Sequence, residues 1–595
     1  MLKHKSKANR GSFKSAAWGL GIVFKASPSY VISTVVSGML EAAKRAVEGV
    51  FLLAILINCI EHRRPFREAL YAVLGFAVFM CLKYVWDAFS DQCIKAKGAE
   101  KIKLKISSML YEKAVGMDIE FYDDPKFYND FVWSMNDAPT KMLHIVQLLY
   151  SMTYSVTSIA LTGLYISVSD PVGIIFAVIS VAFGMAASFS VNRTVLAIET
   201  DKKPWERRRD YVNRVFYLAD YAKDLRMGDM KDELLKYHQT ASDEMEKVID
   251  DYKPRVIFFE FLSALSSSNG ILYLGWLLFR CLVKKAISLG AMVSSYNAVN
   301  TLSNSLQYFS WFVPRIQEDG LYIKKMRTFL ETENPMPNNG KAKLSENFDI
   351  EFKNVSFKYP NTEEFVLKNI NLKIPSGSKV SFVGYNGAGK STLVKLIMRL
   401  YDPTEGEILC GGRNIKDYEL KAYREHIRTL FQDYRIMAAT LGENISMSAS
   451  AVNEREALKV ISDVGFDNVL EELPNGLETE LTKEFYDDGV SLSGGEEQKV
   501  AICRVLYENP DVMILDEPSS ALDPLSEYRL NHTIDKLSGG KTVLFISHRL
   551  STTRYADVIY MLKNGSVIEK GSHSELIEQG GEYAAMFKLQ AQKYR

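Results

Sequence analysis

The chain has 595 residues, of which 47% are hydrophobic, and its 72 basic and 72 acidic residues leave a formal net charge of +0. This length is too great for a single hydrophobic core, so we expect two or more domains. The neutral balance gives no sign of a nucleic-acid partner. The six cysteines are scattered and form no C-x-x-C pair, so neither a disulfide framework nor a zinc site is predicted.

The chain begins with a basic stretch, from Met1 to Arg10, that no clean apolar run with a cleavage site follows. We therefore predict that no signal peptide is cleaved from it. Lys and Arg near membrane segments favour the cytoplasmic side. Residues 1–28 are accordingly predicted to be a cytoplasmic N-terminal segment.

Six segments are apolar and long enough to cross a bilayer, which takes about 20 mainly apolar residues. They are residues 29–60, 69–92, 141–168, 171–191, 256–282 and 286–313. A tight hairpin at Ser169-Asp170-Pro171 joins the third to the fourth, whereas the connections after the second and fourth are long and charged. We predict a six-helix transmembrane domain over residues 29–330, with both termini and both long hairpins in the cytoplasm.

Charged residues lie inside the first two apolar segments. They are Glu41, Lys44, Arg45, Glu48, Lys83 and Asp87. A charge at bilayer depth is costly, so it usually faces a water-filled cavity or pairs with another charge. Two interpretations stay open: an internal ladder of salt bridges, or a polar cavity suited to a peptide or another amphiphilic cargo.

The composition changes after the sixth segment. Residues 331–347 include a run rich in Pro and Asn and are predicted to be a linker. From residue 348 to residue 595, short β-branched or apolar runs alternate with helical stretches. This alternation is typical of an α/β domain.

A glycine-rich run in this second domain fits G-x-x-x-x-G-K-[ST], the phosphate-binding P-loop, and lies between a short strand and a helix. The run is Gly384-Tyr385-Asn386-Gly387-Ala388-Gly389-Lys390-Ser391, followed by Thr392. Its glycines allow backbone N–H groups to turn toward phosphate oxygens, and the helix N-terminus adds partial positive charge. We expect Lys390 to reach the β- and γ-phosphates of ATP and the Ser391 hydroxyl to bind Mg²⁺.

An acidic pair follows a buried apolar strand further along, in the run from Val512 to Glu517. Asp516 ends the strand, where it can hold Mg²⁺ directly or through water. Glu517 is the next residue and can polarise an attacking water. A helix N-cap is the alternative for such a pair, and the P-loop upstream argues against it.

With these parts in place, the chain resembles the ATP-binding cassette (ABC) proteins. Leu492-Ser493-Gly494-Gly495-Glu496 resembles their signature loop and precedes the acidic pair, as in that family. The resemblance covers residues 348–595. It implies that Tyr359 stacks on adenine, that Gln432 senses Mg²⁺, that Asp523 lies in the D-loop and that His548 is the switch histidine near the γ-phosphate.

The resemblance and the motifs together define the candidate site. The catalytic residues are expected to be Lys390, Gln432, Glu517 and His548. The residues expected to bind ATP are Tyr359, Gly384, Tyr385, Asn386, Gly387, Ala388, Gly389, Lys390, Ser391, Thr392, Ser493, Gly494, Gly495 and Asp523. The residues expected to bind Mg²⁺ are Ser391, Gln432 and Asp516.

Two departures from the family pattern stand out. Glu496 occupies the place where the signature loop usually ends in Gln, which leaves the role of that position open. The stretch from Thr482 to Gly489 is more acidic and aromatic than in exporters, where it helps transmit motion between subunits. Details of that transmission are therefore expected to differ here.

Six spans followed by one cassette resemble the half-transporters of the type IV exporter branch. In that family two cassettes pair head to tail, so the resemblance implies a dimer. Both halves of the site are intact in this chain, which favours a homodimer and leaves a heterodimer possible. Glu120–Tyr128 in the first long hairpin resembles the first coupling helix of exporters, and Phe216–Leu225 offers the second.

The predicted architecture is an all-α six-helix transmembrane domain followed by an α/β P-loop NTPase domain of the ABC type. The predicted function is an ATPase that exports a peptide or another amphiphilic substrate across the cell membrane, with its nucleotide-binding domain in the cytoplasm. A lipid-like flippase and a non-transporting ATP-binding sensor or scaffold are the alternatives. Intact Glu517 argues against the last of these.

Overall fold

The computed structural model describes residues 2–267, 269–334, 336, 340–344, 347–360, 362–448, 452–517, 532–536, 539–546 and 553–592. The chain divides into a helical unit and an α/β unit. The helical unit comprises the residues up to Gly116 together with Asn129–Thr332, and the α/β unit comprises Met117–Tyr128 and the residues from Glu333 onward. The predicted order of an all-α part followed by an α/β part is confirmed.

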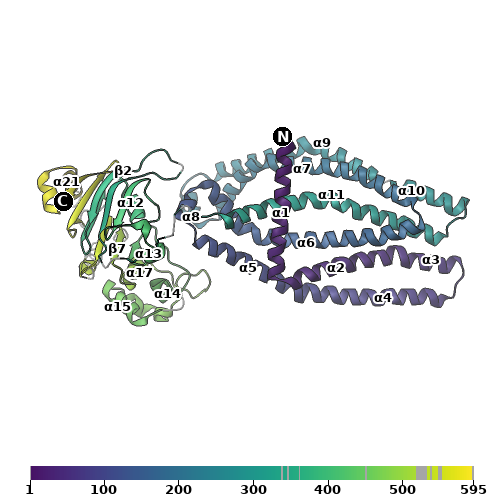
Figure 1. The fold of residues 1–595 in the computed structure, drawn as a ribbon, viewed down its shortest axis with the longest axis horizontal. Helices are drawn as coiled ribbons and strands as arrows, with labels where there is room; N and C mark the ends of the chain where they lie inside the picture. Colours follow the sequence, from purple (N-terminus) through teal and green to yellow (C-terminus); the bar gives the residue numbers. More distant parts are fainter. Residues whose placement is uncertain are drawn as a thin grey trace. The chain divides into compact units, whose positions relative to one another are not determined.

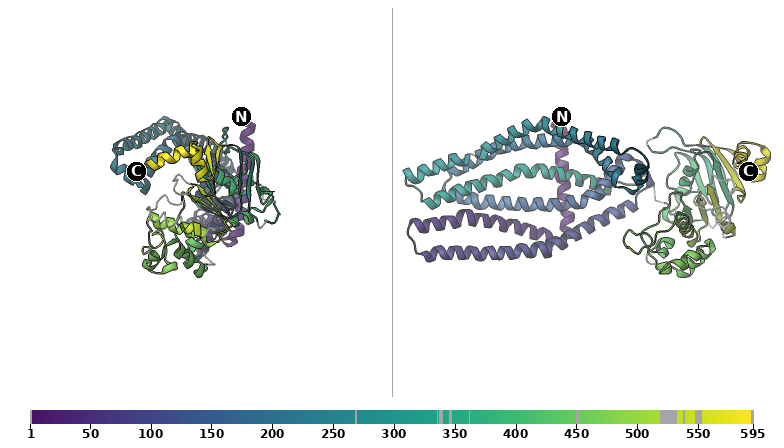
Figure 2. Two further views of the ribbon diagram at one scale, coloured as in Figure 1. Left: turned by 90° about the vertical axis from the view of Figure 1, so that its left-hand side faces the viewer. Right: turned by 180° about the vertical axis from the view of Figure 1, so that it is seen from behind.

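Long helices make up the helical unit, and within it α1 crosses the others, which run alongside one another (Figures 1 and 2). The elements are α1 Leu2–Ala26, α2 Pro28–Ala46, η1 Val47–Leu52, α3 Leu53–Glu61, α4 Phe66–Phe89, η2 Ser90–Lys95, α5 Ala96–Val115, α6 Pro125–Ser169, α7 Val172–Tyr217, α8 Ala219–Met227, α9 Lys231–Ser267, α10 Asn269–Leu278, η4 Phe279–Val283 and α11 Leu289–Glu331.

Four helical stretches in the described part of the chain are long and apolar enough to cross a membrane. They are Phe66–Val115, Asp130–Ser169, Val172–Tyr217 and Lys231–Val283. These stretches contain four of the six predicted spans. The other two lie in α2–η1–α3 and in α11, where the charges of the first and the Ser and Asn residues of the second lower the hydropathy.

Several charged residues of the first two predicted spans pair around Glu41 and Lys83. Lys83 Nζ lies 2.8 Å from Glu41 Oε2 and 2.5 Å from Asp87 Oδ2, and its side chain is buried. Glu41 also contacts Arg45 Nε at 3.2 Å and Lys44 Nζ at 3.7 Å. The structure thus shows the salt-bridge ladder that the first interpretation predicts. The Arg45 side chain stays 57% exposed and its guanidinium lies over the ring of Tyr154.

A π-helical turn, η1, lies between α2 and α3 in the first predicted span, and polar side chains of α11 hydrogen-bond to it. Such a turn disturbs the regular backbone hydrogen bonding of the helix. Ser294 Oγ donates to the Val50 carbonyl at 2.8 Å, and Asn297 Nδ2 donates to the Gly49 carbonyl at 2.9 Å. Buried backbone carbonyls need such partners, so these two bonds hold the π turn against α11.

The crossing helix α1 packs on α11 through small residues. Ser12 and Ser15 of α1 are buried. A Cβ atom added at Gly320 of α11 would come within 2.4 Å of the Ser12 carbonyl oxygen. The two backbones therefore approach as closely as they do only because residue 320 is glycine.

The α/β unit is built on two sheets. A four-stranded antiparallel sheet has the order β2-β1-β4-β5, and a six-stranded sheet has the order β10-β9-β3-β8-β7-β6. All neighbours in the six-stranded sheet are parallel except the pair β10 and β9. The strands are β1 Ile350–Phe357, β2 Leu367–Ile374, β3 Lys379–Gly384, β4 Glu405–Cys410, β5 Arg413–Asn414, β6 Ile427–Leu430, β7 Val512–Asp516, β8 Thr542–Ile546, β9 Val558–Lys563 and β10 Ser566–Gly571.

Helices cover these sheets and build a second, mainly helical part of the unit. They are α12 Lys390–Ile397, α13 Leu420–Glu425, α14 Leu441–Ser446, α15 Glu454–Val464, α16 Asp467–Glu472, α17 Gly494–Tyr507, α20 His573–Gln579 and α21 Glu582–Gln592. The central strand β8 is buried along its whole length. Such an uninterrupted apolar run is typical of a parallel strand covered on both faces.

The segment Met117–Tyr128 comes from the first long hairpin but belongs to the α/β unit by its contacts. Its short 3₁₀ helix η3 spans Ile119–Asp123. Asp118 Oδ2 accepts a hydrogen bond from Met336 N at 3.2 Å. This contact lies just before Glu120–Tyr128, the stretch that the sequence predicts as the first coupling element.

We expect Gly320→Ala to destabilise the protein, although alanine forms helices better than glycine. The added methyl group would displace Ser12, and such overpacking costs about 1–3 kcal/mol. The melting temperature of the purified protein in detergent measures the effect. Gly21→Ala on α1 is the matched control, because no heavy atom lies within 4 Å of a Cβ there. An equal change in both variants would contradict the close α1–α11 contact.

Candidate active site

The glycine-rich loop joins β3 to α12, as the motif requires. A Cβ atom at Gly384 would come within 2.3 Å of the Leu562 carbonyl oxygen of β9. Gly389 has a φ of +99° and directly precedes α12. Glycine is therefore required at both ends of the loop, where the chain turns from the sheet into the helix.

Lys390 begins α12 and folds back over the loop. Its Nζ donates hydrogen bonds to the carbonyls of Gly384 at 2.7 Å and Tyr385 at 3.1 Å. Burial lowers the pKa of Lys390 from its ordinary value, and the nearby Asp516 and Glu517 carboxylates oppose that shift. The ammonium group is thus held inside the loop, where phosphate oxygens would be its stronger partners.

A pocket of about 670 Å³ brings most of the predicted phosphate-site residues together. It is lined by Val366, Asn386, Gly387, Ala388, Gly389, Lys390, Ser391, Thr392, Gln432, Asp516, Glu517 and Ile546. The sheet order explains the assembly, because β3, β8, β7 and β6 are neighbours and end at one edge. The sequence analysis did not identify Val366 and Ile546, which carry no chemical motif.

Glu517 is held in a defined position beside Gln432. Its backbone N donates to the Ile546 carbonyl at 2.9 Å, and its φ is +49°. Gln432 Nε2 donates to Glu517 Oε2 at 3.0 Å. A non-glycine residue in the left-handed region is uncommon and often marks a functional position. The amide of Gln432 and the carboxylate of Glu517 therefore form one hydrogen-bonded pair at the pocket wall.

Asp516 is a half-buried carboxyl group next to a second acid. Burial, and then the charge of Glu517, raise the pKa of Asp516 to about 6, although Lys390 acts in the opposite direction. The Ser391 hydroxyl and the Gln432 amide line the same pocket. Oxygen donors of these kinds suit Mg²⁺, and a divalent cation would relieve the repulsion between the two acids. The residues present therefore fit the expected metal.

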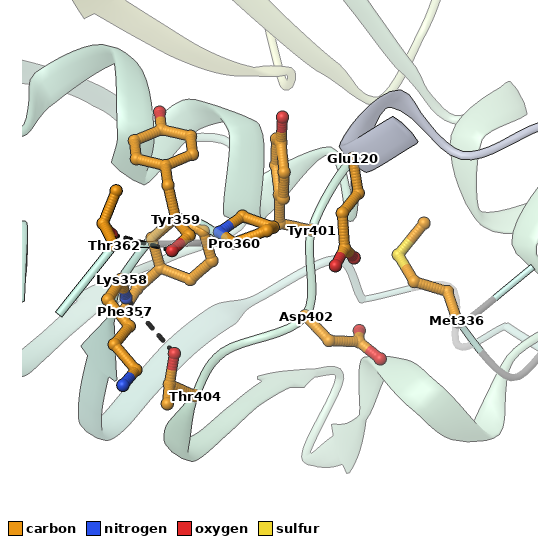
Figure 3. Close-up of a pocket in the computed structure, with 10 residues that line it drawn as sticks. All are labelled: Glu120, Met336, Phe357, Lys358, Tyr359, Pro360, Thr362, Tyr401, Asp402 and Thr404. Carbon is orange, nitrogen blue, oxygen red and sulfur yellow. Dashed lines mark hydrogen bonds between the residues drawn. The ribbon is translucent and has the colours of Figure 1, made fainter. Parts of the chain in front are cut away.

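Tyr359 lies beside the phosphate pocket rather than in its lining. Its hydroxyl shares a hydrogen bond of 3.0 Å with Thr392 Oγ1 of α12. Tyr359 also lines a second pocket of about 340 Å³, together with Glu120 and Met336 (Figure 3). The ring that the family resemblance assigns to adenine is thus anchored by its own hydroxyl to α12, the helix that follows the glycine-rich loop.

The signature loop forms the N-terminus of α17. Ser493 precedes the helix, which Gly494 and Gly495 begin. The Glu496 carboxylate accepts a hydrogen bond from Ser493 N at 2.7 Å, and Tyr434 donates to the Gly494 carbonyl at 3.2 Å. Glu496 thus caps its own helix, a role that needs only a side-chain oxygen.

Not all predicted residues come together in one chain. Ser493, Gly494 and Gly495 do not line the phosphate pocket that Lys390 and Glu517 line. Asp523 and His548 lie outside the described residues. A single chain therefore presents the P-loop half and the signature half of the site as separate surfaces.

Comparisons with known proteins agree with this geometry. The family model described as "ABC transporter" matches residues 367–520. The subtilin transport ATP-binding protein of Bacillus subtilis is 27% identical over 530 residues, which is 87% of this chain and 85% of that protein. A solved bacterial Atm1-family ABC exporter with ATP bound has a TM-score of 0.73 at 22% identity and covers 94% of this chain and 98% of its own.

Lipid transporters match a smaller part of the chain. The ATP-dependent lipid A-core flippase of Escherichia coli strain K12 is 33% identical over 309 residues, which is 52% of each protein. The flippase of Salmonella paratyphi A is 40% identical over 243 residues, which is 41% of each protein. This chain therefore spans about half the length or less of the flippases that it matches.

We expect Asp516→Asn to stabilise the protein at pH 7.5 without nucleotide or metal. The free energy of unfolding should rise by about 1–2 kcal/mol, and the melting temperature should rise with it. The folded protein holds the Asp516 proton up to about pH 6, whereas the unfolded chain loses it near pH 3.8. Wild-type stability therefore falls as the pH rises through this window. At pH 5 the wild type is largely protonated, and the difference from the variant should shrink. A gain of equal size at both pH values would contradict the buried-charge explanation.

The capping role of Glu496 can be tested with two substitutions. Glu496→Gln keeps the oxygen that accepts from Ser493 N, so we expect it to retain the wild-type ATPase rate. Glu496→Ala removes the hydrogen bond to Ser493 N, which costs about 0.5–1.5 kcal/mol, and should lower both the rate and the melting temperature. The assays are phosphate release and thermal unfolding. A Gln variant as impaired as the Ala variant would show that the charge itself matters.

Proposed function

We propose that this chain, a half-transporter of the ABC exporter family, works as a homodimer that moves a peptide or another amphiphilic cargo out of the cytoplasm. The chain binds and hydrolyses ATP. The observation that carries the proposal is the pocket in which Lys390, Gln432, Asp516 and Glu517 meet. It places a phosphate-binding cation and an acidic pair at one edge of a parallel sheet.

The dimer follows from the separation of the two half-sites. The P-loop pocket of one chain lacks the signature residues Ser493, Gly494 and Gly495 in its lining. Head-to-tail pairing would bring the signature loop of one copy against the P-loop of the other. Because each chain carries both halves intact, two identical sites can form. A heterodimer with a related chain is the alternative.

The hydrolytic step is assigned to residues of the pocket wall. Glu517 accepts a proton from the attacking water, and Gln432, bonded to it at 3.0 Å, orients that carboxylate. Lys390 and the backbone of residues 384–392 stabilise the charge on the phosphates. Mg²⁺, held by Ser391, Gln432 and Asp516, would supply further charge neutralisation. His548 is proposed near the γ-phosphate, Asp523 in the D-loop and Tyr359 against the base.

ATP drives transport as a ligand that prefers the closed dimer, and hydrolysis removes that preference. The membrane helices receive the change through their cytoplasmic hairpins. The first, Met117–Tyr128, contacts the α/β unit through Asp118 and Met336. Burial raises the pKa of Asp118, while Arg424 and Arg399 stabilise its charged form. The second hairpin is proposed at Phe216–Leu225, which includes most of α8.

The cargo proposal rests on the charged first span and on the relatives. Arg45 of that span keeps 57% of its side chain exposed although Glu41 pairs with it, as expected of a side chain that faces a polar cavity. The relative named for subtilin transport also aligns over more of this chain than the flippases do. A lipid-like cargo is the second candidate, favoured by the 33% identity to the lipid A-core flippase.

The proposed placement is a multi-pass cell-membrane protein with its N-terminus and its nucleotide-binding domain in the cytoplasm. The proposed domains are residues 1–28 as the N-terminal segment, 29–330 in the membrane, 331–347 as the linker and 348–595 as the ATPase. No nucleic-acid partner is proposed.

Reconstituted vesicles test the function directly. We expect inside-out vesicles carrying the wild type to accumulate candidate peptides when ATP is added, and vesicles carrying Glu517→Gln to bind ATP without accumulating them. Fluorescent peptides and fluorescent lipids are compared in parallel. Accumulation of neither, with normal ATPase, would contradict both cargo candidates. Charge reversal at Glu41 should change cargo-stimulated ATPase more than basal ATPase, and equal effects would remove the cluster from the cargo path.

A further inference from the structure

A cluster of three aromatic rings in the α/β unit includes Tyr359, the proposed base-binding residue, and also contacts the first hairpin. Figure 3 shows Tyr401 standing between Tyr359 on one side and Glu120 of the hairpin on the other. Tyr359 follows β1, Tyr401 follows α12, and Glu120 comes from the segment that enters from the helical unit. Three distant parts of the sequence therefore meet around one side chain.

The rings form a closed set of edge-to-face contacts. Phe357 and Tyr359 have centroids 5.1 Å apart, Phe357 and Tyr401 are 5.5 Å apart, and Tyr359 and Tyr401 are 5.4 Å apart. Phe357 is buried in β1, and Tyr401 is only 2% exposed. Phe357 and Tyr401 belong to a close-packed interior that deforms little, so a tilt of the half-buried Tyr359 toward them displaces Tyr401.

The far end of Tyr401 is fixed to the hairpin. Its hydroxyl donates a hydrogen bond to Asp123 Oδ2 of η3. Burial and the Asp123 carboxylate raise the pKa of Tyr401 well above its usual value, so the hydroxyl stays protonated and remains a donor. The ring of Tyr401 contacts Tyr359, and its hydroxyl is bonded to the hairpin. Because the ring and the hydroxyl belong to one rigid side chain, a movement of one moves the other.

We propose that Tyr401 is a positioning residue that transmits the presence of a nucleobase on Tyr359 to the hairpin Met117–Tyr128. This inference rests on the proposed function only in taking Tyr359 as the residue on which the base stacks. It differs from the contribution of Gln432, which lies in the phosphate pocket. The hairpin then responds to the base as well as to the phosphates.

A base-dependent signal makes a specific prediction about ligands. Tripolyphosphate can occupy the phosphate pocket but has no ring to place against Tyr359. A non-hydrolysable ATP analogue, AMP-PNP, has both parts. Coupling between two sites requires a ligand that contacts both states differently, so only AMP-PNP should order the hairpin through Tyr401.

Hydrogen–deuterium exchange of the full chain in lipid nanodiscs measures this. We expect AMP-PNP with Mg²⁺ to slow amide exchange in Met117–Tyr128 of the wild type by about fivefold or more, and tripolyphosphate with Mg²⁺ to have little effect. Tyr401→Phe keeps the ring contacts and loses the hydroxyl. It should abolish the slowing by AMP-PNP while its dissociation constant for AMP-PNP stays at the wild-type value.

Two further variants separate this role from general stability. Asp123→Asn keeps an acceptor for the hydroxyl and should retain the slowing, whereas Asp123→Ala should lose it. Tyr423→Phe is the matched control, because it removes another buried hydroxyl of the same unit, one that donates to the Ile397 carbonyl at 2.7 Å. It should leave the exchange of the hairpin as in the wild type.

The inference is overturned if Tyr401→Phe keeps the full slowing, or if tripolyphosphate slows exchange as strongly as AMP-PNP. Binding of AMP-PNP to the wild type without any slowing would overturn this inference alone. Failure of AMP-PNP to bind the wild type at all would overturn the ATP-driven function and this inference with it.

Discussion

Two carboxylates held next to each other at the end of a buried strand are the constraint on which the α/β unit depends. Asp516 ends β7, which lies between β6 and β8 in the six-stranded sheet, and Glu517 follows it directly. Partial burial and the neighbouring charge of Glu517 make the charged form of Asp516 costly, and its raised pKa expresses that cost. Two neighbouring groups stabilise the negative charge. Gln432 donates a hydrogen bond to Glu517, and Lys390 adds a nearby positive charge. Bound cation and phosphate would satisfy the same groups better, which is how a ligand can bias the conformation.

The helical unit also carries charged side chains where water is scarce, in its predicted membrane spans. A charge inside a bilayer is costly unless it faces water or is paired, and Lys83 is paired twice, with Glu41 of α2 and with Asp87 one turn along α4. Trp86 of α4 also donates to Ser37 of α2 at 3.0 Å. These polar contacts fix α2 against α4 where apolar packing alone is a weak source of specificity in lipid. Because separating α2 from α4 would leave these charges unpaired, we expect the two helices to move together.

The division of the molecule does not follow the order of the chain. Met117–Tyr128 is connected at both ends to helices of the helical unit but belongs to the α/β unit by its contacts. The hydrogen bonds from Tyr401 to Asp123 and from Met336 N to Asp118 help to hold it there. A segment that belongs to one unit by contact and to the other by connection is well placed to carry force between them.

Much of this could be predicted from sequence because the signals are local. A phosphate-binding loop is one continuous run, an apolar span is a property of its own residues, and the acidic pair directly follows its strand. The sequence alone thus determined the fold class and the P-loop. Only the tertiary structure decided that Lys83 is paired by Glu41 and that Tyr401 meets both Tyr359 and Asp123. These facts depend on which distant elements fold side by side, and no local pattern of residues carries that information.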